Sequence, residues 1–319
     1  NNGKSASPVT PAMYWGESPI MQQLRSLVEK VAITNANILI TGENGTGKEM
    51  LAREIHALSS RRTKEMIAVD MGAITESLFE SELFGHTKGS FTDAYADRPG
   101  KFETADHSTL FLDEIWNLSY EVQIQLLRAL QERRIRPVGS NKEIEVNVRL
   151  ISATNENLQK AIEKGNFRED LFHRINEFTL RMPSLKERQE DILLFANFFL
   201  DQANHELDRH LIGFDTAASN ALQTYSWPGN LRQLKNIVKR ATLLAQGSYI
   251  TLTELGYELV ESSSASPTST SLSLHDEATE KKRILEALQQ TGNNKSKAAL
   301  LLGIDRKTLY NKLKLYNIQ

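Results

Sequence analysis

Two hydrophobic periodicities alternate along the chain as far as Pro183. Short apolar runs predict buried strands at residues 38–40, 67–69, 109–112 and 146–151. Apolar positions three or four residues apart predict helices between them, as at 49–58 (Met50, Leu51, Ile55 and Leu58) and at 121–131. Strands that alternate with helices pair in parallel through crossovers. The pattern therefore predicts an α/β fold with a parallel, doubly wound sheet sandwiched by helices.

After Pro183 only the helical spacing remains, at residues 190–207, 216–225 and 230–245. This predicts an all-helical subdomain behind the α/β core. Residues 261–275 are rich in Ser and Thr, which predicts a flexible linker. A helix is expected at about 277–290, and then two more, at 296–302 and from Asp305 onward. Asp305 is a suitable N-cap, and Leu309 and Leu313 would face inward. Gly303 and Ile304 are expected to form the tight turn of a helix-turn-helix.

Composition narrows the class of protein. The chain has 319 residues, 38 Lys and Arg, 40 Asp and Glu, and no Cys. The lack of Cys excludes a disulfide scaffold, a thiolate zinc site and a Cys nucleophile, and it fits a cytoplasmic protein. No apolar run reaches the roughly 18 residues of a membrane span, and the first residues show no signal-peptide pattern. We therefore expect no membrane partner. Because the first residue is not Met, we expect a fragment or a processed chain.

Charge is divided unevenly between the two ends of the chain. Residues 276–319 carry nine basic and five acidic side chains, a net charge of +4. The whole-chain net charge of −2 leaves −6 for the rest. A small basic module tethered to a larger acidic body predicts nucleic acid as the partner of the module.

A glycine-rich turn follows the first strand and fits a phosphate-binding loop (P-loop). It matches G-x-x-x-x-G-K, but Glu49 stands where a Ser or Thr usually binds magnesium. Backbone N–H groups at the start of a helix would cradle phosphates, and Lys48 would reach the outer ones. A chance Gly-rich turn is the alternative, although the strand before and the helix after argue against it. The predicted ATP-binding residues are Gly42, Glu43, Asn44, Gly45, Thr46, Gly47, Lys48 and Glu49.

A second nucleotide motif is TLFLDEI at 109–115, a buried strand that ends in Asp113 and Glu114. In nucleotide hydrolysis one carboxylate orients Mg²⁺ and the next polarises the attacking water. The alternative is a solvated acidic turn at the end of a strand. The P-loop upstream favours the catalytic interpretation.

Seven strings together resemble one family. They are GESPIM (16–21), ITGENGTGKE (40–49), ESELFGHTKGSFTDA (80–94), TLFLDE (109–114), GNFREDLFHRIN (165–176), PSLKERQEDI (183–192) and WPGNLRQLKN (227–236). With the C-terminal module, the likeness runs from Tyr14 to Gln319. It is to the sigma-54-dependent transcription activators, the NtrC-like bacterial enhancer-binding proteins of the AAA+ ATPase class. In that family Glu at the position of Glu49 is usual.

The resemblance implies roles for individual residues of the core. Residues 105–114 would line the nucleotide site, with Asp113 and Glu49 on Mg²⁺ and Glu114 activating water. Asn155 resembles the first sensor, and Arg232 the second sensor on the helical lid. Arg168 and Arg174 resemble arginine fingers that reach the ATP of the next subunit, which implies a dimer that assembles into a hexameric ring. The alternative for Arg174 is an i,i+4 ion pair with Asp170.

The segment GSFTDA resembles the loop by which the family contacts sigma-54, commonly GAFTGA. The predicted contact residues are Gly89, Ser90, Phe91, Thr92, Asp93 and Ala94. The alternative is that Phe91 tucks into its own domain. Asp93 adds a charge and restricts φ relative to the usual Gly. Asp70 stands where the family often has an Asn that switches the catalytic Glu, and an ionised carboxylate cannot donate a hydrogen bond.

The C-terminal module resembles the Fis-type helix-turn-helix. Arg306 and Asn311 are candidates to read base edges, and the lysines would mostly meet phosphates. The predicted DNA-binding residues are Lys295, Lys297, Arg306, Lys307, Thr308, Tyr310, Asn311 and Lys314. Lys312 is a further phosphate candidate. A dimer on a palindromic site is expected, and a solvated helical hairpin is the alternative.

The predicted organisation is a tail (1–13), an AAA+ P-loop core (14–182), an α-helical lid (183–258), a flexible linker (259–275) and a small all-α helix-turn-helix domain (276–319). The predicted function is an ATPase that binds enhancer DNA and remodels the sigma-54 RNA polymerase holoenzyme toward the open complex. One alternative is a DNA-binding repressor with a weakened motor, motivated by Asp93 and Asp70. A replication initiator or helicase loader of the AAA+ class is another, in which the GSFTDA loop has no purpose. The resemblance also implies that a regulatory domain, such as a two-component receiver or a ligand-sensing domain, stands ahead of a segment like residues 1–12 in many relatives.

Overall fold

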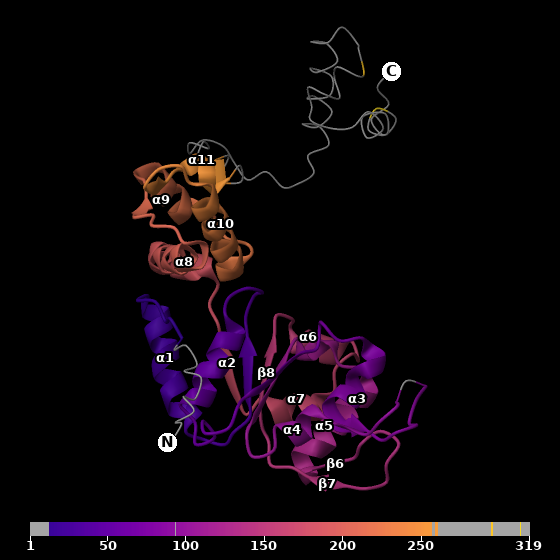
Figure 1. The fold of residues 1–319 in the computed structure, drawn as a ribbon. Helices are drawn as coiled ribbons and strands as arrows, with labels where there is room; N and C mark the ends of the chain where they lie inside the picture. Colours follow the sequence, from indigo (N-terminus) through magenta and orange to yellow (C-terminus); the bar gives the residue numbers. More distant parts are fainter. Residues whose placement is uncertain (1–12, 93, 257–258, 261–294, 296–312, 314–319) are drawn as a thin grey trace, which may run out of the picture. The chain divides into compact units, whose positions relative to one another are not determined.

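The computed structural model describes residues 13–92, 94–256, 259–260, 295 and 313 (Figure 1). The chain divides into two compact units, residues 1–264 and 265–319. Residues 1–12 of the predicted tail, residues 261–275 of the predicted linker and nearly all of the helix-turn-helix lie outside the described residues. Met13, the last residue of the predicted tail, and Leu259, the first of the predicted linker, are described and are buried in hydrophobic cores of the first unit. Leu313 is described and is buried, as predicted. The account below therefore concerns the first unit.

The first unit is built on a five-stranded sheet in which every neighbouring pair is parallel. The strand order is β2 (Ile67–Asp70), β5 (Thr109–Asp113), β8 (Arg149–Thr154), β1 (Ile38–Thr41) and β9 (Phe178–Arg181). Residue Ile38 of β1 pairs with Ile151 on one side and Phe178 on the other. The predicted parallel, doubly wound sheet is confirmed.

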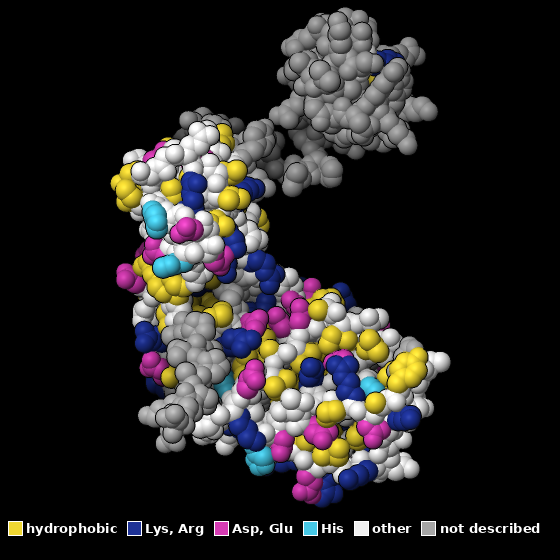
Figure 2. Space-filling view, in the orientation of Figure 1, with side chains coloured by type: hydrophobic (Ala, Val, Ile, Leu, Met, Phe, Trp, Pro, Cys, Tyr) yellow, Lys and Arg dark blue, Asp and Glu magenta, His cyan; other side chains and the backbone are white. Residues whose placement is uncertain are grey.

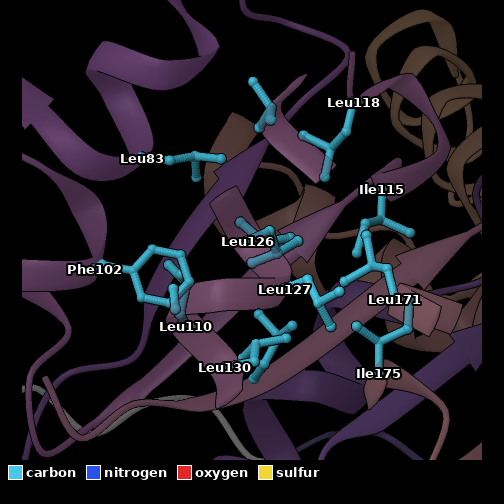
Figure 3. Close-up of a cluster of buried hydrophobic side chains, with 14 of the residues drawn as sticks. Leu83, Phe102, Leu110, Ile115, Leu118, Leu126, Leu127, Leu130, Leu171 and Ile175 are labelled. Carbon is cyan, nitrogen blue, oxygen red and sulfur yellow. The ribbon is translucent and has the colours of Figure 1, made fainter. Parts of the chain in front are cut away.

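Alternate residues of the sheet enter two different hydrophobic cores, as the pleat of a strand requires. In β5, Leu110 and Leu112 join one core, and Phe111 joins the other. The Phe111 core includes α1 (Pro19–Ala32) and α2 (Lys48–Ala57). The opposite core includes α3 (Phe79–Phe84), α4 (Lys101–Thr104), α5 (Tyr120–Glu132), α6 (Leu158–Glu163) and α7 (Glu169–Ile175). Figure 3 shows this second core, in which Phe102 lies beside Leu110 and Leu171 lies near Ile115 and Ile175.

Two short antiparallel pairs extend from the core. β3 (Gly85–His86) pairs with β4 (Arg98–Pro99), and β6 (Arg134–Ile135) pairs with β7 (Ile144–Glu145). A bridge between His86 and Val138 joins the two. The short 3-10 turns η1 (Glu76–Leu78) and η2 (Ile115–Asn117) follow β2 and β5. The segment 87–97, which includes GSFTDA, is therefore held at both of its ends by a strand pair.

The helical subdomain after Pro183 has its own hydrophobic core around Trp227. It begins with η3 (Leu185–Asp191) behind a capping box made by Ser184 and Glu187. The helices are α8 (Ile192–Leu207), α9 (Thr216–Thr224), α10 (Asn230–Leu244) and α11 (Leu252–Leu255). The prediction of helices alone is wrong in one detail. A two-residue parallel pair, β10 (Gly213–Phe214) with β11 (Tyr249–Ile250), ties the start of α9 to the start of α11.

Two other sequence predictions need correction. The fourth strand begins at Arg149 and not at Val146, because Val146 N–H donates to Arg133 O and belongs to the β6–β7 hairpin. In α2 the predicted apolar face is rotated: Leu51 and Ile55 are buried, but Met50 and Leu58 are exposed. No helix in the described ranges is long and apolar enough to cross a membrane.

His56 joins the end of α2 to the sheet. Its Nε2 lies 2.8 Å from Lys64 O and its Nδ1 lies 2.9 Å from Thr109 Oγ1. A carbonyl only accepts, so Nε2 carries the proton and Nδ1 accepts from the hydroxyl. Burial, together with the guanidinium groups of Arg149, Arg53 and Arg61, lowers the pKa of His56.

Replacement of His56 should change how stability depends on pH. Because the folded pKa of His56 is depressed, its contribution is present above the unfolded value of about 6.5 and is lost as pH falls through the folded pKa. In His56→Gln the free energy of unfolding should therefore fall less steeply as the pH is lowered. The difference in slope should be at most about 1.4 kcal/mol per pH unit. Urea denaturation between about pH 5.5 and 8 measures the slope. His205→Gln, at an exposed position, is the control; equal slopes in all three proteins would contradict the assignment.

Candidate functional site

The candidate site lies where β1, β5 and β8 end, because the carboxyl ends of neighbouring parallel strands meet at one edge of the sheet. β1 runs into the P-loop, β5 ends at Asp113, and β8 ends just before Asn155. Within the predicted nucleotide-lining range 105–114, only Asp113 and Glu114 lie at this edge. Residues 105–108 precede β5 and lie at the opposite edge, so that part of the prediction is wrong.

The P-loop has the backbone geometry that its glycines predict. Gly47 is the N-cap of α2 with φ 104°, a left-handed conformation that favours Gly. Gly45 has φ 76°, and a Cβ there would collide with Gly229 O of the helical subdomain. α2 begins at Lys48, so the first N–H groups of a ten-residue helix point toward the loop. The loop is therefore shaped to bind an anion.

Lys48 is 6% exposed, and its ammonium is folded back onto the loop. Nζ donates to Gly42 O at 3.0 Å and to Glu43 O at 3.2 Å. Burial lowers the pKa of Lys48; the carboxylates of Asp113 and Glu114 oppose this, and the guanidinium of Arg232 adds to it. The charges of both carboxylates and of Arg232 therefore act on the P-loop ammonium.

Asp113 and Glu114 sit at the end of β5 with different environments. Burial raises the pKa of the Asp113 carboxyl, against the opposing effect of the Lys48 ammonium. Asp113 Oδ1 accepts the Glu114 N–H at 3.0 Å. Glu114 has φ 53°, and its Oε2 accepts a hydrogen bond of 2.7 Å from Trp116 Nε1. Asp70 ends the neighbouring strand β2 and pairs in register with Asp113.

Glu49, predicted as a second metal ligand, is engaged elsewhere. Its Oε1 accepts two hydrogen bonds from Arg53, one turn further along α2. Asn155, predicted as the first sensor, is exposed beside Thr154 and lines a cavity of about 320 Å³ that also touches Thr41 at the end of β1.

The helical subdomain contacts the P-loop at three points. Arg232 N–H donates to Gly45 O at 3.2 Å. Asn230 Nδ2 donates to Glu43 Oε2 at 3.0 Å and to Asn44 O at 3.1 Å. Arg188 Nη2 donates to Thr46 O at 3.0 Å. Of these residues, sequence reasoning singled out Arg232 only, although Arg188 and Asn230 lie in the strings PSLKERQEDI and WPGNLRQLKN.

The two predicted arginine fingers do not come together, and each is bound to groups of α5 or α7. Arg168 Nη1 donates to Tyr120 Oη at 3.0 Å and Nη2 to Asp170 Oδ2 at 2.6 Å. Arg174 Nη2 donates to Leu130 O at 3.0 Å, and its Nη1 lies 3.7 Å from Glu177 Oε1. The alternative of an Arg174–Asp170 pair is wrong, since Asp170 is paired with Arg168. Tyr120 and Leu130 lie at opposite ends of α5.

The GSFTDA loop is closed by its own backbone. Gly89 N–H donates to Ala94 O at 2.8 Å, and Ala94 N–H donates to Phe91 O at 3.0 Å. Phe91 is half-buried, with its ring edge-on to His86 at 4.9 Å between centroids. The predicted exposed aromatic is thus partly tucked in, while Thr92 is exposed. Asp93 lies outside the described residues.

The predicted DNA-binding residues Lys297, Arg306, Lys307, Thr308, Tyr310, Asn311 and Lys314 also lie outside the described residues, and Lys295 alone of that set is described. On the face of the first unit shown in Figure 2, acidic and basic side chains are interspersed and not separated into fields. This face therefore offers no basic field of the kind that binds nucleic acid.

Comparison with protein families accounts for nearly the whole chain. Residues 14–181 match the family described as Sigma-54 interaction domain, and residues 186–272 match the AAA+ ATPase lid domain. Residues 277–316 match the family described as Bacterial regulatory protein, Fis family.

Among characterised proteins, the transcriptional regulatory protein ZraR of Escherichia coli K12 is 47% identical over 299 residues, 93% of this chain and 67% of that protein. The regulatory protein AtoC of the same organism is 42% identical over 321 residues, which cover 97% of this chain and 70% of AtoC. Crystal structures of NtrX from Brucella abortus, one with ADP and one with ATP, both superpose with a TM-score of 0.74. They are 36% and 37% identical, and each comparison covers 95% of this chain and 69% of NtrX.

Asn230 gives a test of the contact between the helical subdomain and the P-loop. It is fully buried at φ 50°, and Asn230 Oδ1 also accepts the Leu185 N–H at 2.7 Å. Asn230→Gly removes the three side-chain hydrogen bonds, but Gly can adopt the positive φ of this position. It should cost roughly 2 kcal/mol of unfolding free energy and weaken nucleotide binding. Asn230→Ala should cost about 1 kcal/mol more, because Ala resists positive φ.

Urea denaturation and titration with a fluorescent ADP analogue measure the two effects. Asn236→Ala, at an exposed position further along α10, is the control. If Asn230→Gly bound nucleotide as tightly as the unaltered protein, these hydrogen bonds would not shape the P-loop.

Proposed function

The chain belongs to the sigma-54-dependent transcription activators of the AAA+ class, and from this membership we propose that it hydrolyses ATP in a ring to remodel sigma-54 RNA polymerase. The chain matches the family models of the sigma-54 interaction domain, the AAA+ lid and the Fis-type regulatory protein in succession. The observation that carries the proposal is the arrangement at one sheet edge. There β1 leads into the P-loop with Lys48, β5 ends at Asp113 and is followed by Glu114, and Arg232 N–H donates to Gly45 O of the P-loop. Each supplies a function that phosphoryl transfer needs.

The P-loop amides and Lys48 would bind the phosphates of ATP, with Arg232 beside them on the lid. For this, the Lys48 ammonium exchanges the carbonyls of Gly42 and Glu43 for phosphate oxygens. Arg232 adds positive charge near the same point, so that closure of the lid and binding of ATP favour each other. Asn155 would orient the outer phosphate or the attacking water.

The site also fits Mg²⁺. Among the described residues no group of three or more His, Asp or Glu side chains forms a metal cage. Asp113 offers a single partly buried carboxylate, which suits a cation that takes its other ligands from phosphates and water. Bound there, Mg²⁺ would neutralise charge that develops on the phosphates. Glu49 can contribute only if its carboxylate leaves Arg53.

Glu114 would accept a proton from the attacking water, and Arg168 and Arg174 would complete the site of the neighbouring subunit. Neither arginine contacts the described P-loop of its own chain, and both are exposed enough to be recruited, with side chains 25% and 41% exposed. Release of Arg168 from Asp170 and Tyr120 is then part of assembly. Hydrolysis would occur only where two subunits meet.

A mixing experiment tests these roles together. Glu114→Gln should retain nucleotide affinity but lose ATP turnover by roughly 100-fold or more, and Arg168→Ala should lose turnover similarly. Mixed rings contain interfaces with an intact Glu114 on one side and an intact Arg168 on the other, so equimolar mixing should restore part of the activity. Phosphate release measures it.

Arg62→Ala, which changes an exposed arginine of the core, should leave turnover unchanged. Normal turnover by Glu114→Gln would refute its role. Failure of the mixture to recover any activity would refute action of Arg168 in trans.

The GSFTDA loop would contact sigma-54, and we propose that the nucleotide state moves Phe91 out from His86. Phe91→Ala should then keep ATP turnover but lose at least about tenfold in affinity for sigma-54, because a buried aromatic anchor is removed. Gel-shift binding to purified sigma-54, with ADP and a metal fluoride as a mimic of the hydrolysis transition state, measures it. Tyr95→Ala is the matched control, since Tyr95 is 78% exposed just beyond the loop.

Three outcomes are informative. A complex that needs both the analogue and Phe91 supports the activator. Unimpaired binding by Phe91→Ala would contradict the role of this loop. Weak ATP turnover with intact DNA binding and no complex would favour a repressor.

A further inference from the structure

Trp116 directly contacts the carboxylate that the proposed function makes the base. It is the second residue after Glu114, in η2, and its Nε1–H donates to Glu114 Oε2 at 2.7 Å. Trp116 is 40% exposed, whereas Trp15 and Trp227 are 7% and 1% exposed. Burial of its ring therefore does not explain a large aromatic side chain at this position.

The bond holds Glu114 on one side of the sheet edge. In the strand order β2-β5-β8-β1, the P-loop strand is separated from β5 by β8, and β2 lies on the other side. Gly72 follows β2, and a Cβ built there would lie 3.8 Å from Glu114 Cγ. The side chain of Glu114 is therefore turned toward the β2 side, away from the loop that follows β1.

The neighbouring Asp70 does not provide this restraint. It ends β2 in register with Asp113, but its Oδ1 accepts the Gly72 N–H at 2.9 Å. An ionised carboxylate has no hydrogen to donate and would repel that of Glu114. Within the described part of the chain, Trp116 is the side chain that donates a hydrogen bond to the Glu114 carboxylate.

We propose that Trp116 is a positioning residue that holds Glu114 in a resting orientation, away from the nucleotide, until the indole bond breaks. This rests on the proposed role of Glu114 in activating water. With one carboxylate oxygen bound to the indole, Glu114 faces β2, and its rotation toward the P-loop first requires loss of that bond. The left-handed backbone of Glu114 places its side chain and the indole, two residues on, within reach of each other.

Trp116→Phe tests the proposal because it keeps the ring and removes the N–H. In the full chain, kcat for ATP hydrolysis should rise by roughly three- to tenfold. This is the factor expected if the net free energy of one hydrogen bond no longer adds to the barrier. KM should change by less than about twofold, since no group that touches the phosphates is altered. An unchanged or lower kcat would overturn the proposal.

A second measurement does not depend on turnover. The measurement is tryptophan fluorescence. Subtracting the emission spectrum of Trp116→Phe from that of the unaltered protein isolates the signal of Trp116, because both proteins contain the other two tryptophans. Glu114→Ala should shift this signal without nucleotide, and a non-hydrolysable ATP analogue with Mg²⁺ should shift it in the unaltered protein. Trp15→Phe, a tryptophan in the other core, should leave both shifts in place.

The two measurements separate the two ideas. If Glu114→Ala leaves the Trp116 emission unchanged, the indole bond is absent and the proposal falls, whether or not the protein hydrolyses ATP. If that emission shifts but Glu114→Gln still turns over ATP normally, the bond exists and the role of Glu114 in the proposed function is refuted, and with it the resting-orientation proposal.

Discussion

A buried guanidinium joins the three parts of the nucleotide-binding unit. Arg188 is 1% exposed, and it binds Thr46 O of the P-loop, Met21 Sδ of α1 and the ring of Phe195 on α8. Burial lowers its pKa to about 10, so it stays charged at neutral pH. A buried cation is costly unless it is well bound. Arg188 therefore links the positions of the P-loop, α1 and the lid, so that a shift of one of them moves the others.

Asp191, three residues further on, extends that constraint to the segment before α1. It is fully buried and accepts the N–H groups of Glu17 and Ser18 and the Ser18 hydroxyl. The short turn η3 thus fixes the P-loop through Arg188 and the first residues of the core through Asp191. Together with the contacts from Asn230 and Arg232, this couples the conformation of the lid to that of the P-loop.

The main features of the fold could be predicted from the sequence because they rest on periodicity: the apolar runs at 38–40 and 109–112 are buried on both faces, and few structures allow that. Short elements could not. The two-residue pair β10–β11 has no hydrophobic repeat, and the shift of the fourth strand to Arg149 depends on a buried guanidinium that donates to carbonyls at the end of α1. In the site, Lys48, Asp113 and Glu114 could be named because motif residues follow strands. Trp116, Arg188 and Asn230 could not, since each acts through a side-chain bond to a partner that only the folded chain brings near.

The close approach of two loops has a consequence for exchange of parts among relatives. A Cβ at Gly139, which has φ 78°, would lie only 2.5 Å from Ser90 Cβ and 2.9 Å from Thr87 Oγ1. The β6–β7 hairpin and the GSFTDA segment are far apart in sequence, yet neither can change its backbone path independently. If the GSFTDA segment were replaced by the corresponding loop of a relative, the new loop would keep its conformation only if the tip of the β6–β7 hairpin were exchanged as well. The GSFTDA segment and the tip of the β6–β7 hairpin therefore behave as one structural unit.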